Sequence, residues 1–215
     1  WHKGQQVNYT ELKTNIADIC ENTFTSDQYA MLTKQAEQRI YNSVEIPPLR
    51  KNQTGTLTTA YQYLIYPTDF LYPLSLAIVD GSGNYNYLLS KDVNFIREAY
   101  PDSTTTGEPK HYAIFDKTAF ILGPTPDSNY AAEIQYGYYP ESIVTAGTTW
   151  LGDDFDSALL NGALVEAIRF LKGEPDMVAL YEKMYIHAIT LLSNLANVKL
   201  RGDAYRDGEP RRGAA

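Results

Sequence analysis

The sequence has a single cysteine, Cys20, among its 215 residues. One thiol can form neither an intramolecular disulfide framework nor a zinc site built from cysteines. No stretch approaches the roughly 18 uninterrupted apolar residues of a membrane helix, so we expect no membrane span and no membrane partner. The first residues also lack the apolar run of a secretory signal. These absences exclude a disulfide scaffold and an integral membrane protein.

Positive charge is also scarce. The chain has 18 Lys and Arg against 26 Asp and Glu, a formal net charge of −8. A protein that binds DNA without regard to sequence needs a cationic surface to displace counterions, so this class is disfavoured. The deficit is uneven along the chain. Residues 199–215 carry five positive and three negative side chains, a net of +2, which leaves −10 for the rest.

Catalytic signatures are missing as well. The sequence contains no phosphate-binding G-x-x-x-x-G-K-[ST], no zinc-binding H-E-x-x-H, no G-x-S-x-G and no C-x-x-C. The histidines, His2, His111 and His187, lie far apart in sequence, and Cys20 reads as a small buried apolar residue. We therefore expect no catalytic residue, no metal site, no cofactor and no enzymatic activity.

Three acidic residues lie close together in the sequence and allow two interpretations. Asp153, Asp154 and Asp156 could together ligate a hard cation, but acids at the start of a helix, near the positive end of its dipole, explain them more simply. A hydrolase that uses Asp153, Asp154 or Glu166 with a bound metal remains a third alternative. Glu166 and Arg169 are spaced for a helical ion pair.

Residues 9 to about 46 are predicted to form two helices. The break falls near Asn22-Thr23, Thr25 or Ser26 is the expected N-cap, and Pro47-Pro48 ends the second helix. The pattern depends on apolar residues three or four apart. These are Tyr9, Leu12, Ile16 and Ile19 in the first helix and Tyr29, Leu32, Ala36 and Ile40 in the second.

Residues 50 to about 148 have a β pattern. Short alternating runs are separated by turn signals, and Asp80–Asn84 between two apolar runs predicts a hairpin. Ser90 is the expected cap of one short helix, residues 91–99. The predicted strands lie within 57–65, 74–79, 85–89, 111–115, 119–122 and 131–139.

Residues 153 to about 200 are predicted to be helical again. The segment 158–171 is apolar nearly all round, so we expect it to bury one side on its own chain and another on a neighbouring copy. Gly173-Glu174-Pro175 stops this helix and starts the last one. The last helix has an apolar stripe made of Met177, Leu180, Met184, Ala188, Leu191, Leu195 and Val198.

The expected fold class is therefore α+β. We expect a bundle of N- and C-terminal helices with an inserted antiparallel β subdomain. The expected parts are an additional N-terminal segment (1–8), N-terminal helices (9–49), a β-rich insertion (50–150), C-terminal helices (151–200) and an extended arm (201–215).

Tyrosine is the one abundant residue type with a possible functional meaning. There are 18 tyrosines against 7 Phe and 2 Trp. Three readings stay open: packing within strands, protein–protein contact and stacking on carbohydrate. The tyrosines proposed for a subunit or tail interface are Tyr61, Tyr63, Tyr136, Tyr138 and Tyr139.

Many short strings, in one order over residues 9 to 207, resemble the head-to-tail adaptor proteins of tailed bacteriophages, also called connector or neck proteins. None of them is a chemical signature, and the likeness depends on their number and order. They are Ala36–Asn42, Ile46–Lys51, Tyr66–Leu71, Leu88–Ile96, Gly107–Ala113, Leu122–Pro126, Tyr138–Glu141, Trp150–Gly152 and Leu180–Lys183.

The resemblance implies a structural virion protein of the neck, assembled in the host cytoplasm. It implies a dodecameric ring beneath the portal protein, with a tail or nozzle protein as the other partner. The ring lines the DNA exit channel, which double-stranded DNA passes without specific binding. Family habit and tail composition together suggest portal binding by Arg201, Tyr205, Arg206, Arg211 and Arg212. The alternative is a tyrosine-rich tail or receptor-binding module that recognises carbohydrate or a host surface protein.

Overall fold

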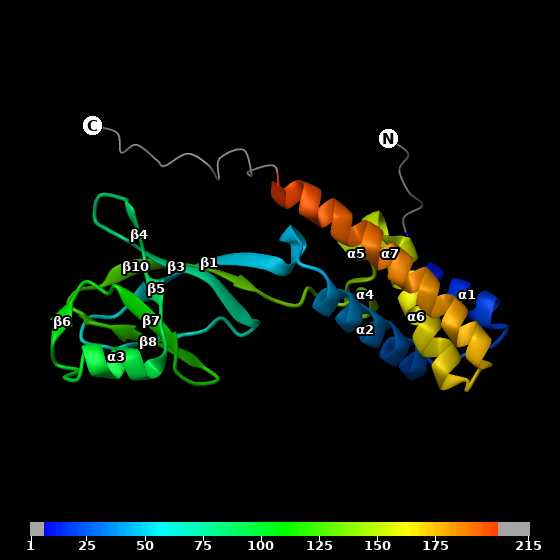
Figure 1. Ribbon diagram of the computed structural model, residues 1–215, viewed down its shortest axis with the longest axis horizontal. Coiled ribbons are helices and arrows are strands. Elements are labelled where there is room, and N and C mark those ends of the chain that lie inside the picture. The colour runs from blue at the N-terminus through cyan, green and yellow to red at the C-terminus, as the bar shows by residue number, and fades with distance from the viewer. Residues whose placement is uncertain (1–6, 202–215) are drawn as a thin grey trace. The chain divides into compact units, whose positions relative to one another are not determined.

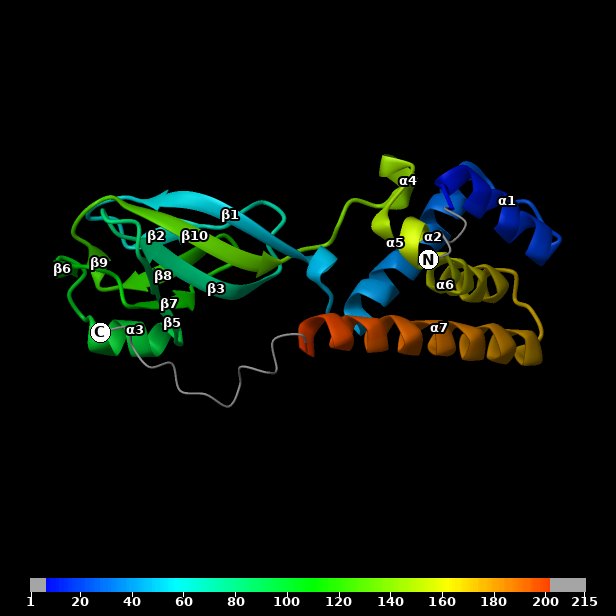
Figure 2. The same cartoon turned by 90° about the horizontal axis from the view of Figure 1, so that it is seen from above.

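The computed structural model describes the backbone of residues 7–201 and the side chains of residues 7–195 (Figures 1 and 2). Over these residues the fold is α+β, with seven α-helices and largely antiparallel sheets. The chain divides into two compact units, each with its own apolar core. We call them the helical unit, which takes the described residues up to Leu49 and from Pro140, and the β unit, Arg50–Tyr139.

The helical unit joins segments from both ends of the chain. Its helices share one core that includes Leu12, Leu32, Leu159 and Leu192. Its elements are α1 (Tyr9–Cys20), α2 (Ser26–Ser43), the 3-10 turn η1 (Pro47–Leu49), α4 (Ile143–Ala146), α5 (Trp150–Asp154), α6 (Asp156–Phe170) and α7 (Pro175–Arg201).

Local capping sets where the first two helices begin. The Asn8 side chain accepts a hydrogen bond from the Glu11 backbone N–H at 2.9 Å, and the Glu11 carboxylate accepts one from the Asn8 backbone N–H. Thr25 and Gln28 form the same reciprocal pair at α2, which confirms Thr25 as one of the two expected caps. The helix starts are thus encoded within three residues of each cap.

Residues 7 and 8 belong to the helical unit, although they were expected in an additional N-terminal segment. Asn8 caps α1, and Val7 is buried. The backbone N–H of Val7 donates to the carbonyl oxygen of Gly152 at 3.1 Å. This bond ties the segment just before α1 to α5.

The helix expected from residue 153 is two helices. α5 ends at Asp154, and Phe155 leaves the helical conformation before α6 begins at Asp156. The Phe155 ring packs edge-on against Trp150, with 6.0 Å between ring centroids. Asp153 and Asp156 therefore lie in the first turns of different helices, where each faces a separate helix dipole.

α6 is the central helix of this unit, because it contacts α1, α2, α5 and α7. Most of its apolar residues from Ala158 to Ile168 are buried by the chain's own helices, with Leu160 half-buried. These neighbours explain most of its all-round apolar character. Phe170 is 44% exposed, and packing of this segment on a neighbouring copy stays a prediction.

The β unit is built from two four-stranded sheets that share an apolar core. One sheet has the order β1-β10-β3-β4 and the other the order β2-β8-β7-β5, while β6 and β9 form a small pair. The strands are β1 (Arg50–Leu57), β2 (Tyr63–Ile65), β3 (Tyr72–Val79), β4 (Tyr85–Tyr87), β5 (Leu89–Ser90), β6 (Thr106–Gly107), β7 (His111–Ile114), β8 (Ala119–Gly123), β9 (Thr125–Pro126) and β10 (Tyr130–Gly137).

One short helix, α3 (Val93–Ala99), covers part of the second sheet. Ile96 of α3 packs with Ala113 and Ile121, which point away from the shared core of the two sheets. The cap of α3 is Asp92 and not Ser90, because the Asp92 carboxylate accepts from the Phe95 N–H at 2.7 Å.

The strands follow the predicted runs in part. Antiparallel pairing of β3 with β4 confirms the hairpin at Asp80–Asn84. The pattern does not predict β1, whose polar residues are placed by pairing with β10 in the register Arg50↔Gly137 to Leu57↔Tyr130. The β unit ends at Tyr139, earlier than the expected boundary at 150, because α4 and α5 pack in the helical core.

Among the described residues, no helix combines the length and the apolar character that a membrane span requires.

Candidate assembly surfaces

Helix α7 has apolar side chains on two sides. Its inner side faces the core of the helical unit through Tyr185, Ala188 and Leu192, all buried, with Tyr181 and Ile189 partly buried. Of the stripe seen in the sequence, only Ala188 lies on this inner side, and Val198 lies beyond the described side chains. The remaining members of the stripe are exposed.

These exposed members form a surface that we call the outer stripe: Met177, Leu180, Met184, Leu191 and Leu195. Each is between 43% and 52% exposed, which is unusual for five large apolar side chains on one helix. They follow one another at three- or four-residue steps if the exposed His187 is counted between Met184 and Leu191. One side of α7 is thus an apolar line that is interrupted at His187.

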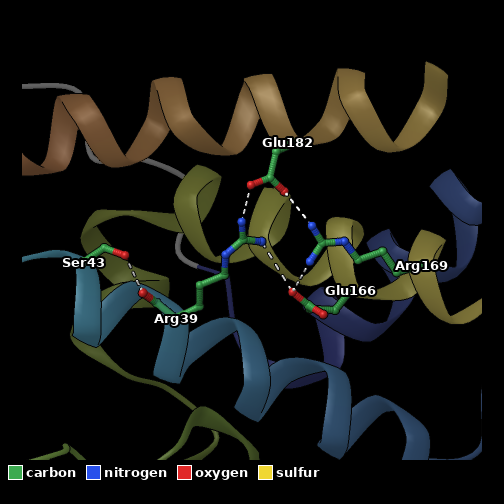
Figure 3. Close-up of polar contacts among 5 residues, drawn as sticks. All are labelled: Arg39, Ser43, Glu166, Arg169 and Glu182. Carbon is green, nitrogen blue, oxygen red and sulfur yellow. Dashed lines mark hydrogen bonds and ion pairs between the residues drawn. The ribbon is translucent and has the colours of Figure 1, made fainter. Parts of the chain in front are cut away.

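A cluster of four charged side chains fixes the rotation of α7 (Figure 3). Arg39 of α2 pairs with Glu166 of α6 at 3.4 Å and also with Glu182 of α7. Arg169 of α6 pairs with Glu166 at 3.5 Å and with Glu182 at 3.4 Å. The four charges alternate in sign and join three helices, and we call them the ion-pair cluster.

Two further contacts support Arg39. Its guanidinium carbon lies 4.4 Å from the ring centroid of Tyr185, a cation–π distance, and its backbone carbonyl accepts from the Ser43 hydroxyl at 2.6 Å. At about 100° per residue, Glu182 lies about 140–180° around α7 from every residue of the outer stripe. Holding Glu182 toward α2 and α6 therefore keeps the outer stripe turned away from them.

Of the ion pairs in this cluster, the sequence predicted one, Glu166 with Arg169, and the structure confirms it. Arg39 was missed, since it lies 127 positions from Glu166 and 143 from Glu182, and Glu182 was missed with it. No local pattern connects residues at such separations. One indication of a buried ion pair was present in the sequence, which was Arg39 next to Ile40 in the apolar pattern of α2.

In the β unit, Tyr61 and Tyr63 lie together. Their rings meet edge to face with centroids 5.8 Å apart, and Tyr63 also packs against Phe115 at 5.0 Å. Tyr61 is 50% exposed and Tyr63 is half-buried. We call Tyr61, Tyr63 and Phe115 the aromatic patch. Arg97 of α3 approaches the Phe115 ring at 5.7 Å.

Tyr136 does not belong to any surface, which corrects its assignment to an interface. The residue is fully buried in the core of the β unit. Its hydroxyl donates to Asp69 Oδ1 at 2.7 Å, with Gln53 Oε1 at 3.3 Å. Burial and the hydrogen bond to Asp69 raise the pKa of Tyr136 to about 12. This phenol is a structural hydrogen-bond donor.

Tyr138 and Tyr139 lie at the end of β10, away from the aromatic patch in the strand order. Tyr138 is half-buried beneath Lys51, whose Nζ is 5.3 Å from the ring centroid. Lys51 also pairs with Asp69 at 2.6 Å. Tyr139 is 40% exposed. The five proposed tyrosines are therefore divided between two places and the core.

The proposed arm is residues 201–215, of which the structure describes only the backbone of residue 201. α7 continues to Arg201, so the helix reaches the residue at which the arm was expected to begin. The Arg201 side chain and Tyr205, Arg206, Arg211 and Arg212 lie outside the described residues. Their assignment to portal binding remains a proposal.

Side chains suited to chemistry are scattered over the described residues. Burial raises the pKa of the Cys20 thiol, which lowers its nucleophilicity. His111 packs against Phe95 and lies 3.0 Å from the Tyr100 hydroxyl, and burial lowers its pKa. No group of three or more potential metal ligands is found among the residues that the structure describes.

A cavity of about 80 Å³ lies between the two sheets of the β unit. Apolar side chains dominate its lining, with Leu64, Leu76, Phe120 and Ile134 from the shared core, and Gln53 and Thr54 at the β1 edge. This lining resembles incompletely filled core more than a site for a polar substrate.

Exposed apolar surface on a rigid scaffold defines a class of protein that works through contacts with other proteins. The comparison with known families agrees, since the model described as "SU10 adaptor protein" matches residues 7–212. The chain belongs to this family of phage head-to-tail adaptors, which confirms the resemblance found in the sequence. No curated protein matches the chain closely enough to add a second comparison.

Membership makes this chain a structural protein of a bacteriophage and implies a place in the virion neck. It also implies contacts with portal and tail proteins in general. The match begins at residue 7, which is also the first residue that the structure describes. It covers both units and not a single one.

Proposed function

We propose that this chain assembles as a dodecameric ring beneath the portal and connects the capsid to the tail or nozzle. The observation that carries the proposal is the family match, because it extends over both units of the chain. The helices of the helical unit form the bundle of each subunit, and neighbouring subunits meet along this bundle. The protein acts by binding, without catalysis, and the ring assembles in the host cytoplasm.

The charge of the chain supports a role around DNA. The sequence outside residues 199–215 carries −10, so a wall made from it repels phosphates instead of binding them. A channel that DNA must leave quickly needs such a wall. DNA passes the ring without specific binding in this proposal.

The two ends of the ring have different partners. The segment 201–215, with Arg201, Tyr205, Arg206, Arg211 and Arg212, docks on the portal protein. The exposed Tyr61 and Tyr139 and the half-buried Tyr63 of the β unit contact the tail or nozzle protein, because a phenol combines apolar area with a polar tip. Tyr138, half-buried beneath Lys51, belongs to the same proposed contact.

Electron microscopy of the purified chain with the portal protein of the same phage tests the proposal. We expect closed rings on the portal, and the same portal without the chain is the control. Deleting residues 201–215 should abolish capture by the portal in a pull-down. Portals that stay bare at saturating concentrations of the intact chain would overturn the adaptor proposal, and a deletion variant that binds normally would overturn the role of the arm.

Sugar recognition has weaker support in the β unit. Aromatic rings that bind sugars offer a flat face, but Tyr61 and Tyr63 meet at 69° and Tyr63 and Phe115 at 49°. Glycan-array binding by the monomer that disappears in Tyr61→Ala would favour the receptor-binding alternative over the adaptor.

A further inference from the structure

We infer that the outer stripe of α7 is the surface on which a helix of the neighbouring copy packs when the chain assembles. This inference rests on the proposed ring and adds the surface that holds it together. The stripe consists of Met177, Leu180, Met184, Leu191 and Leu195, all close to half exposed.

Helix α7 has large apolar side chains that its own chain does not bury. In α6 most apolar residues are buried by four neighbouring helices, whereas α7 is buried on its inner side alone. Thr190, Asn194 and Lys183 on other sides of α7 show that the helix can carry polar residues where it faces water. Five large apolar side chains in one line therefore mark a face that is covered in the assembled protein.

Rearrangement within the helical unit cannot hide this line. Turning the outer stripe inward would require a rotation of about 90° and would withdraw Glu182 from Arg39 and Arg169. It would also expose Tyr185 and Leu192, which are now buried. The ion-pair cluster thus presents the stripe as a fixed outer surface.

The outer stripe runs along most of the described part of α7. It extends about 27 Å, at about 1.5 Å per residue from Met177 to Leu195. A partner that covers this length must lie beside the helix over several turns.

The spacing of the stripe identifies the covering element as a helix. Steps of three and four residues, with His187 in the middle position, are the pattern of one seam of a helix pair. A strand or loop would not match this period over five turns. Met and Leu, without polar tips, suit a contact that stays dry.

The direction of the stripe favours a neighbouring copy over the portal or the tail protein. The stripe follows the long side of α7 and is not confined to either end of the helix. In the proposed ring the helices of each bundle run along the ring axis, so a partner above or below meets their ends and a neighbouring copy meets their sides. The stripe thus belongs to the side-to-side contact.

The size of the stripe agrees with a place at the centre of that contact. A band about 27 Å long and about 10 Å wide covers about 270 Å², roughly a third of the 800 Å² that each partner of a stable interface contributes. The stripe alone does not hold two free copies together. It acts as the buried centre of a larger interface that closes when several copies are aligned.

The test compares two variants of α7. In the stripe variant, Leu180→Gln is combined with Leu191→Gln, and both changes keep a residue that favours helices. The matched control is Ile186→Gln, because Ile186 is also exposed (55%) but lies about 120–180° around α7 from the stripe residues. Circular dichroism should give all three proteins the same helix content, with Tm values within about 2 °C.

Assembly on the portal of the same phage is then titrated. We expect the stripe variant to need at least about tenfold more protein for half-maximal ring formation, and the control to match the unchanged chain. Equal titrations for the stripe variant and the unchanged chain would overturn the inference while the adaptor function stands. Failure of the unchanged chain to assemble at all would instead count against the proposed function.

A crosslinking arm identifies the occupant directly. In a Cys20→Ser background, Leu191→Cys and Ile186→Cys carry a benzophenone label, and two forms of the chain that differ in tag size are mixed on the portal. We expect crosslinks between the two forms from position 191 and not from position 186. Crosslinks from position 191 to the portal, or only within one chain, would overturn the assignment to a second copy.

Discussion

The helical unit and the β unit expose apolar surface in different ways. On the helical unit, five exposed Met and Leu side chains follow α7 as one line, whereas Ile19, Met31 and Phe170 are exposed singly on other helices. On the β unit, the exposed large side chains come from several strands, and tyrosines such as Tyr61, Tyr85 and Tyr87 are prominent among them. Tyr85 satisfies its hydroxyl on Glu133 at 3.0 Å.

The difference indicates two kinds of contact. A line of side chains without polar atoms gains most from a partner that excludes water completely. Tyrosines lose little when water stays at the rim, so they suit contacts that form and adjust during attachment. In the proposed ring, the helical unit therefore carries the lasting contact between subunits, and the β unit carries the contact with a different protein.

The largest expected effect tests whether the two cores are independent. Phe120 is fully buried in the β unit among Tyr66, Phe70 and Tyr112, with ring centroids between 4.5 and 5.4 Å away. Phe120→Ala should lower the unfolding free energy of the β unit by about 3–5 kcal/mol. Hydrogen exchange read by mass spectrometry should show faster exchange in residues 50–139 and little change in α6.

Leu159→Ala is the reciprocal control, since Leu159 is fully buried in α6. It should cost about 2–5 kcal/mol and accelerate exchange in the helical unit alone. If both variants accelerate exchange in both units equally, the units share one cooperative transition and the comparison between them fails.

The next effect concerns the ion-pair cluster. Arg39→Gln leaves Glu166 and Glu182 with Arg169 as their remaining partner. This change should lower the unfolding free energy by about 1–3 kcal/mol. Arg169→Gln should cost less, because its side chain is 49% exposed against 28% for Arg39. Urea unfolding followed at 222 nm measures both. Equal losses of unfolding free energy in the two variants would show that Arg39 contributes no more to stability than Arg169.

A smaller effect separates buried from exposed tyrosine. Tyr136→Phe removes a hydroxyl that donates to Asp69 in the core and should cost about 1 kcal/mol. Tyr61→Phe removes an exposed hydroxyl and should change the unfolding free energy by less than about 0.5 kcal/mol. Thermal unfolding of the two variants checks this. A larger loss in Tyr61→Phe would contradict the placement of these residues.

The smallest effect is the pH dependence due to Glu37. This carboxylate is buried in α2 and accepts from the Ile143 N–H at 2.8 Å. Burial raises its pKa, against the opposing hydrogen bonds from Ile143 and Ser142. The folded protein therefore binds this proton more tightly than the unfolded chain. The stability from this group is fully present below the unfolded value of about 4.3 and is lost as pH rises through the folded pKa.

Glu37→Gln keeps an oxygen acceptor and removes the buried charge. We expect its Tm at pH 7 to exceed that of the unchanged chain by about 1–2 °C, with the difference shrinking toward pH 4. A variant that is less stable than the unchanged chain at pH 7 would show that the charge on Glu37 strengthens its bond to α4 by more than burial costs.

Local signals predicted those elements that local interactions determine. The cap at Thr25 and the turn at Asp80–Asn84 are each specified by residues close together in sequence, and both are found in the structure. β1 was not predicted, because its sequence from Arg50 to Thr56 is polar and does not alternate. Its strand conformation comes from pairing with β10, some 80 residues later.

The surfaces were harder to predict for the same reason. The period of α7 reveals a stripe, but whether that stripe faces the core depends on Arg39, which is distant in sequence. Tyr61 and Tyr136 are alike as residues in β-rich segments. Only the fold buries Tyr136 next to Asp69, 67 positions away. Residue type identifies candidate contact residues, and tertiary pairing decides which of them reach the surface.

The pairing of β1 with β10 has a consequence for how such a chain changes over time. The β unit begins at Arg50 and ends just after Gly137, and these two residues are paired neighbours in one sheet. Entry and exit are therefore about 5 Å apart, the spacing between adjacent strands. A unit joined in this way is a cassette: a short loop can replace it, or another unit can take its place, without rebuilding the helices.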